Sequence, residues 1–445
     1  MSLIQTLRNA TVSAILIPVL LTGTRAGAED LNQVYDLALT RDAIYQAAQA
    51  QYLAAREASP QARSFLLPQF NAFGEYGRSD TSIRNDQTFG DRDFGSGQTQ
   101  YGLNASQVIF DRELFIGLDQ AEKSVMQAEA EVEAARQDLI LRVASAYFDV
   151  LSAEDTVRFT GAAKEAIYKQ LEQAEKRFDV GLIAITDVKE AQADFDNARA
   201  LEIAAINDLS IAKSSLWVVV GERLGEIAKL SERMPLISPE PQDIQEWIDK
   251  ALEQNLDLIA TRLASENAQL EVKRQRSGHY PRFGLDATAN QNNADGGTFG
   301  GRNTGTLGFN IRMDLPIYSG GRVNSLTREA RHDFQRAQET LVQTQRDTTK
   351  QAADSYLTVL SNISRVEALK QAVESNQASY EATQAGFDVG TRTSVDVSLA
   401  IQGLFSAERD YAISRYEYLL ATLSLKRSAG TLTVNDIEKI NTWLD

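Results

Sequence analysis

The stretch TLGFNIRMDLP, residues 306–316, alternates apolar side chains with polar or small ones. Its apolar side chains fall on every second position: Leu307, Phe309, Ile311, Met313 and Leu315. Asn310, Arg312 and Asp314 occupy positions between them. Because successive side chains of a strand point to opposite faces, this pattern predicts a β-strand with one apolar and one polar face.

The same alternation occurs in RFGLDATAN, residues 282–290, and more weakly around residues 70–76 and 100–109. Each segment has about the 9–11 residues that a tilted strand needs to cross a bilayer. A half-buried strand of a soluble sheet alternates in the same way, so alternation alone does not decide between the two.

Long polar segments follow the first strand of each pair, at residues 80–98 and 291–305, and suit the outer loops of a membrane barrel. Four strands cannot close a cylinder, and an open strand edge in lipid leaves backbone groups unsatisfied. We therefore expect several chains to pool their strands. Two chains would supply eight strands and three would supply twelve, and the pattern does not choose between them.

The chain is a tandem duplication. RFDVGLIAITDV, residues 177–188, matches GFDVGTRTSVDV, residues 386–397, so that Gly181 and Gly390 lie 209 positions apart. Tyr147 and Tyr356 keep this offset. A period above 200 residues is too long for a solenoid and indicates a duplicated half-protein.

Each half is expected to contain a helical approach, two strands and a very long pair of helices. Residues 323–385 contain no glycine or proline and would form a helix about 95 Å long. The predicted segments are a signal peptide (1–28), a helical approach (29–68), two strands (69–110) around an outer loop (80–98), long helices (111–221) with a tip near 181, an equatorial linker (222–243), a second helical approach (244–281), two strands (282–315) around an outer loop (291–305), long helices (316–430) with a tip near 390, and a C-terminal equatorial segment (431–445).

The first residues are typical of a secretory signal peptide, with Arg8, a mostly apolar run over residues 10–21, and a small-x-small cleavage pattern before Glu29. That run is short for a transmembrane anchor. No later segment has 18 consecutive apolar residues, so we expect an exported protein without a membrane-spanning helix.

Composition excludes several classes of function. The formal net charge of −16 opposes a nucleic-acid partner, and the absence of cysteine removes thiol chemistry and Cys-ligated metals. With only two histidines and four methionines, no metal or cofactor is expected. The glycines of residues 296–301 lack the strand–turn–helix setting of a nucleotide site. The sequence therefore predicts a protein that is not an enzyme.

Five stretches together resemble the TolC family of outer-membrane channel-tunnel proteins: EAIYKQLEQAEKRFDVGLIAITDV (165–188), GHYP (278–281), LPIYSGGRVNS (315–325), VGTRTSVDV (389–397) and SLKRSAGTLTVNDI (424–437). The resemblance implies a mostly α-helical homotrimer, with a 12-strand barrel among outer-membrane lipids and a 12-helix tunnel in the periplasm of a Gram-negative bacterium. Family members are passive exit ducts. A periplasmic adaptor and an inner-membrane pump or ABC exporter recruit them for multidrug efflux or one-step (type I) protein secretion.

The two FDVG turns would be the periplasmic hairpin tips. Glycine accepts the left-handed conformation that ends a helix, and Thr186 or Ser394 is expected to help start the returning helix. The resemblance implies that the tips bind the adaptor through Val180, Gly181, Leu182, Val389, Gly390 and Thr391.

A gate latch is also implied by the resemblance, in which Arg392 bonds Thr186 and Asp187 and holds the entrance constricted. Asp396 would form a ring of carboxylates at the pore constriction, attracting cations. Phe387 stands where some family members have a tyrosine in the latch, and Leu399 where a second acidic ring can occur. These departures predict a weaker latch and a single ring.

One alternative has a different function: a secreted, elongated coiled-coil scaffold without channel activity. It would need no amphipathic strands and would be purified without detergent.

Overall fold

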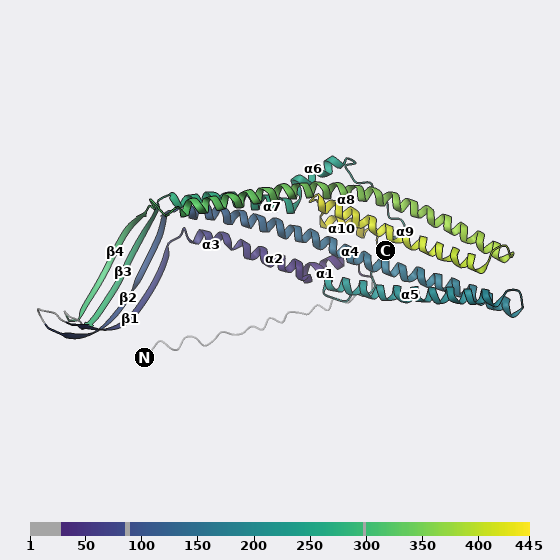
Figure 1. The fold of residues 1–445 in the computed structure, drawn as a ribbon, viewed down its shortest axis with the longest axis horizontal. Helices are drawn as coiled ribbons and strands as arrows, with labels where there is room; N and C mark the ends of the chain where they lie inside the picture. Colours follow the sequence, from purple (N-terminus) through teal and green to yellow (C-terminus); the bar gives the residue numbers. More distant parts are fainter. Residues whose placement is uncertain (1–27, 85–89, 297–299) are drawn as a thin grey trace, which may run out of the picture.

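The computed structural model describes residues 28–84, 90–296 and 300–445. The molecule is elongated, with a four-stranded sheet at one end and two helical hairpins reaching the other end (Figure 1). All but the last residue of the predicted signal peptide, 1–28, lie outside the described residues.

The sheet is antiparallel, in the order β1-β2-β3-β4. Its strands are β1 (Gln69–Ile83), β2 (Arg92–Phe110), β3 (Arg282–Gly296) and β4 (Arg302–Asp314). The side chains predicted to share the apolar face stand opposite one another in the ladder, as in the pairs Leu285–Ile311 and Ala287–Phe309. Ile311 and Phe309 are exposed, so the single chain leaves this apolar face uncovered.

The strands run farther than the sequence indicates, which corrects the predicted outer loops. Ile83 pairs with Arg92, so parts of 80–98 are strand, and Ala294 pairs with Arg302 within 291–305. Polar composition suggested loop there. A hairpin ladder is held by backbone hydrogen bonds and can continue through polar residues once the partner strand is beside it.

Short helices precede each pair of strands: α1 (Leu31–Arg41), α2 (Ala43–Arg56) and α3 (Ala58–Ser64) in the first half, then α6 (Ile244–Gln254), α7 (Leu256–Arg276) and the 3₁₀ turn η1 (Ser277–His279) in the second. The long helices are α4 (Arg112–Asp179), α5 (Ile185–Val220), α8 (Arg322–Asp388) and α9 (Ser394–Ser428), and α10 (Val434–Asn441) ends the chain. The predicted fold class of two half-repeats, each with two strands and a long helical hairpin, is confirmed.

The main core lies at mid-length, where the equatorial segments pack on the long helices. Tyr147 of α4 and its repeat counterpart Tyr356 of α8 are both buried there. The Tyr147 hydroxyl donates to the carbonyl of Ala228 (2.8 Å), and that of Tyr356 donates to the carbonyl of Gln242 (2.9 Å). The duplicated tyrosines thus fasten the linker between α5 and α6 to both halves.

Among the helices of the described ranges, α5 alone is long and apolar enough to cross a membrane, with a mean hydropathy of 1.4 over its most apolar window. One such helix is weak support for a span. It belongs to a hairpin on the far side of the core from the strands (Figure 1). Most of that window is exposed in the single chain, so the exposed apolar surface of α5 needs an explanation other than a membrane span.

Candidate functional site

The first tip, residues 180–184, is a glycine turn between α4 and α5. Gly181 has a φ of +78°, in the left-handed region that favours glycine. Its N–H donates to the carbonyl of Phe178 (2.8 Å), and the N–H of Leu182 donates to that of Arg177 (2.9 Å). These bonds satisfy carbonyl groups that the end of α4 would leave free.

The second tip, residues 389–393, has the same geometry between α8 and α9. Gly390 has a φ of +83°, its N–H donates to the carbonyl of Phe387 (3.0 Å), and the N–H of Thr391 donates to that of Gly386 (2.8 Å). The repeated FDVG sequence therefore makes the same turn twice.

The second returning helix begins one residue earlier than expected, with Thr393 rather than Ser394 as its cap. The Thr393 hydroxyl accepts from the N–H of Asp396 (3.2 Å), and the Asp396 carboxylate accepts from the N–H of Thr393 (3.0 Å). Hydrogen bonds from Thr393, aided by the positive charge of Arg392, hold the pKa of the Asp396 carboxyl below its usual range. Asp396 is therefore a negative charge fixed at this tip.

The first returning helix starts differently, with Ala184 rather than Thr186 as its cap. Alanine has no side-chain acceptor, so only half of the arrangement forms, with the Ala184 N–H donating to the Asp187 carboxylate (3.4 Å). The Thr186 hydroxyl also lies 3.5 Å from an Asp187 oxygen. Among the ion pairs of the described chain, none joins Asp187 to Arg392, so the latch remains a prediction.

Arg392 lies along the end of α8. Its backbone N–H donates to the carbonyl of Gly386 (3.3 Å). A Cβ added at Gly386 would stand only 2.8 Å from the Arg392 Cγ. Glycine at position 386 therefore leaves the space that the Arg392 side chain occupies.

Both tips present apolar side chains to solvent. Val180, Leu182 and Val389 are 69%, 73% and 76% exposed. Added Cβ atoms at Gly181 and Gly390 would meet nothing within 4 Å, so the turns are open on their outer side. Apolar groups held on rigid turns at the end of a molecule are suited to contact a partner.

Phe387, which stands where some family members have a latch tyrosine, is buried. It is 6% exposed, in a cluster that includes Ile167, Val397 and Ile401. The guanidinium carbon of Arg177, on the other hairpin, lies 4.2 Å from its ring centre. Sequence reasoning missed Arg177. The available signal was that arginine precedes the first FDVG while glycine precedes the second.

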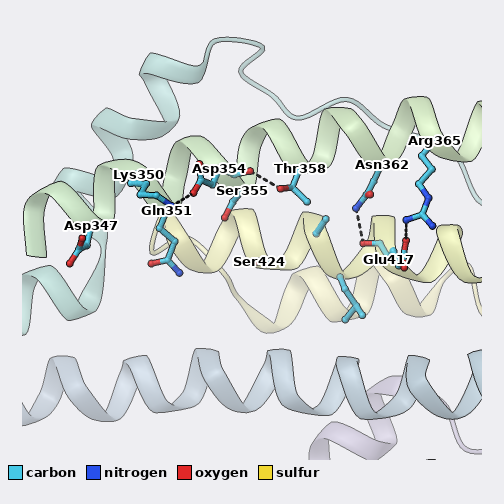
Figure 2. A pocket seen from close by; sticks show the side chains of 12 residues that line it. Asp347, Lys350, Gln351, Asp354, Ser355, Thr358, Asn362, Arg365, Glu417 and Ser424 are labelled. Atoms are coloured by element: carbon cyan, nitrogen blue, oxygen red, sulfur yellow. Dashed lines mark hydrogen bonds and ion pairs between the residues drawn. The ribbon is translucent and has the colours of Figure 1, made fainter. Parts of the chain in front are cut away.

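A groove of about 710 Å³ runs between α8 and α9 at mid-length (Figure 2). Figure 2 shows two ion pairs along it, Lys350 with Asp354 (2.5 Å) and Arg365 with Glu417 (2.6 Å), and Asp347 apart from them. In the part of the chain that the structure describes, no group of three His, Cys, Asp or Glu side chains could hold a metal ion. The groove is a polar wall whose charges are largely neutralised.

The sequence profile of the outer membrane efflux protein family matches residues 34–222 and 247–431. The chain belongs to this family.

Outer membrane protein TolC of Vibrio cholerae serotype O1 is 36% identical over 420 residues, which are 94% of each chain. The alkaline protease secretion protein AprF of Pseudomonas aeruginosa is 29% identical over 412 residues, 91% of this chain and 85% of AprF. The fold matches the Campylobacter jejuni CmeC outer membrane channel with a TM-score of 0.78 at 17% identity, covering 94% of this chain and 90% of that one. The predicted resemblance to the TolC family is confirmed, and the protein resides in the outer membrane of a Gram-negative bacterium.

Proposed function

We propose that this protein is the outer-membrane exit duct of a tripartite efflux pump or of a type I secretion system. It is a passive trimeric channel, opened at its periplasmic end by an adaptor and an inner-membrane pump or ABC exporter. One observation carries this proposal. In a single chain, both the sheet and the layer of long helices are open, with an uncovered edge on each side. Membership of an efflux family favours the duct over a secreted scaffold.

The sheet edges support closure by further copies. β1 and β4 each pair on one side only, and unpaired strand edges are not tolerated in lipid. Because the two edge strands differ, β1 of one copy would pair with β4 of the next. Such head-to-tail joining closes into a ring. Three copies give the twelve strands of an even-stranded barrel.

The duplication supports the same closure among the helices. Within one chain, α9 packs on α4, where Tyr416 stacks on Phe148 and its hydroxyl donates to Asp155 (2.7 Å). Phe148 and Leu151 are buried in α4.

The repeat counterparts of Phe148 and Leu151 lie uncovered on α8. Leu357 and Leu360, 209 positions later, are 55% and 36% exposed. On α5, Val218 is 71% exposed at the position that corresponds to Arg427, which is buried against Asp138 of α4. Pairing α8 with α5 of the next copy would repeat the α4–α9 contact and cover the apolar face of α5.

The tips are proposed to bind the adaptor through Val180, Gly181, Leu182, Val389, Gly390 and Thr391. The exposure of their valine and leucine side chains supports this role. Arg392 is proposed to reach Thr186 and Asp187 of an adjacent tip, since the pair is not formed within one chain. A directional Arg–carboxylate bond can be broken by a competing partner, as a gate requires.

The groove of Figure 2 is proposed to face the cargo path. Glu417 and Ser424 line it, whereas Thr422 and Lys426 on the opposite face of α9 lie toward α10 and the linker. If the equatorial segments surround the duct, this groove faces its lumen. Its paired charges would make a hydrated wall with little preference for one cargo.

Deletion of the gene, with complementation, tests the function. We expect loss of drug resistance, of one or more exported proteins, or of both, restored by the intact gene. Unchanged drug sensitivity and unchanged export in a strain that normally makes the protein would contradict the proposal.

A further inference from the structure

We infer that the Phe387 ring and the Arg177 guanidinium form a clasp, which joins the two tips of one chain and keeps the entrance constricted. The inference rests on the proposed function, because it assigns a contact to the gate of that duct. It concerns residues within one chain, whereas the Arg392 latch is proposed to act between chains.

The geometry is that of a cation–π contact to a buried aromatic ring. The Arg177 guanidinium carbon lies 4.2 Å from the ring centre, and the ring itself is buried. A cation over an aromatic face is attracted to it, more strongly where the pair is shielded from water. Arg177 lies in the last turn of α4 and Phe387 in the last turn of α8, so the contact joins the residue before the first FDVG to the first residue of the second.

Neighbouring contacts bind the same two hairpins together. Gln170 of α4 donates to Gln384 of α8 (3.1 Å), and Phe387 packs with Ile167 of α4. The clasp is therefore the outermost member of a contact zone that the hairpins would have to leave if they parted.

The clasp explains how the gate can hold with phenylalanine at position 387, where some family members have a latch tyrosine. Loss of a hydroxyl at position 387 predicts a weaker gate from the sequence alone. In the structure the Phe387 ring faces inward and Arg177 covers it, so an aromatic face replaces a hydroxyl as the point of attachment.

The duplication shows where the clasp cannot recur. At an offset of 209, Arg177 corresponds to Gly386, which has no side chain and leaves room for that of Arg392. Phe387 corresponds to Phe178, which is 40% exposed and not in a core cluster. A junction between copies that repeats the junction within the chain would lack the arginine, so the clasp is specific to the hairpin pair of a single chain.

Single-channel recording in planar bilayers tests the clasp. Phe387→Leu keeps the apolar bulk and removes the aromatic face, and Arg177→Gln removes the cation. Each should raise mean conductance about two- to five-fold, as expected when one contact of this strength is lost from the closed state. The double variant should show no further rise, because both changes remove one interaction.

Controls separate the clasp from folding and from channel function. Arg336→Gln removes an exposed arginine whose ion pair, among the described residues, is with Asp333 on its own helix, and conductance should stay at the wild-type value. Phe387→Tyr keeps the aromatic face and should keep the wild-type conductance. If the wild type forms pores and Phe387→Leu has the same conductance, the clasp is overturned. Effects of the two single changes that add up in the double variant would overturn it as well. Failure of purified, membrane-inserted wild type to form pores would instead contradict the duct.

Discussion

At the scale of single residues, Asp396 has a structural bond as well as its proposed place in the pore. Its carboxylate caps the start of α9 through Thr393. Replacement by alanine would remove both the cap and the charge, and a changed conductance could then arise from either loss. Asparagine keeps an oxygen acceptor for Thr393 and removes only the charge.

We therefore predict that Asp396→Asn weakens block of the channel by divalent cations and leaves the fold intact. Block is measured as the cation concentration that halves the current in planar bilayers. Asp388→Asn, a charge removed from the same tip outside the proposed ring, serves as the control. Equal block in wild type and Asp396→Asn would reject the ring.

Acidification should reproduce this loss in the wild type only at low pH. The folded pKa of Asp396 is lowered, so its cap stabilises the protein above the unfolded pKa of about 3.9 and is lost as pH falls through the folded value. Cation block should persist from neutral pH down to about pH 4. Block that disappears well above this pH would contradict a ring in which the bonds from Thr393 keep Asp396 ionised against repulsion from its neighbours.

Arg392 is the residue on which the proposed latch depends. Arg392→Ser should raise single-channel conductance, because a hydroxyl cannot bridge to Thr186 and Asp187 of an adjacent tip. Arg392→Lys should recover part of the constriction, since it keeps the charge but not the bidentate geometry. Conductance equal to wild type in Arg392→Ser would remove the latch from the account.

At the scale of elements, Arg427 joins three helices at one point. Its side chain is 10% exposed and bonds Asp138 of α4 (2.7 Å) and Asp257 of α7 (3.0 Å). Arg365 of α8 offers a matched pair, bonded to Glu417 (2.6 Å) but with both partners largely in solvent.

We predict that Arg427→Met lowers stability by about 1–2 kcal/mol, less than a fully buried network because its two aspartates are exposed. Arg365→Met should change it by less than about 0.5 kcal/mol. Thermal unfolding of the detergent-solubilised protein compares the two. Equal shifts would show that Arg427 acts only as a surface charge.

Elements differ in how well sequence specifies them. The strand faces follow from local alternation, and the long helices from the absence of glycine and proline over many turns. Gly161 lies inside α4 without ending it, because a single glycine costs only about 1 kcal/mol in a helix. The strand ends were missed, since continuation of a ladder depends on a partner strand rather than on composition.

At the tips too, the sequence predicts the local features and misses a contact between distant segments. Their turns could be predicted because glycine supplies a left-handed residue in both copies. The Arg177–Phe387 contact could not, because it joins two hairpins and leaves no periodic trace in either. Its geometry exists only once α4 and α8 lie together.

At the scale of the whole molecule, the duplicated chain ends on each side in an edge strand and a long helix that have neighbours within the chain on one side only. In Figure 1, β4 and α8 lie along one side and β1 and α5 along the other. We propose that contacts between chains repeat the contacts between the halves of one chain. Asn207 of α5 and Ser364 of α8, both exposed, correspond to the bonded pair Tyr416 and Asp155.

The most direct test of the account is cross-linking at this pair. The chain has no cysteine, so Asn207→Cys with Ser364→Cys introduces the only thiols. Treatment of the membrane-embedded variant with a short bis-maleimide should give dimers and trimers on denaturing gels and nothing larger, while either single variant stays monomeric. A ladder that continues past three chains, or no cross-linking between chains, would contradict a closed three-chain duct.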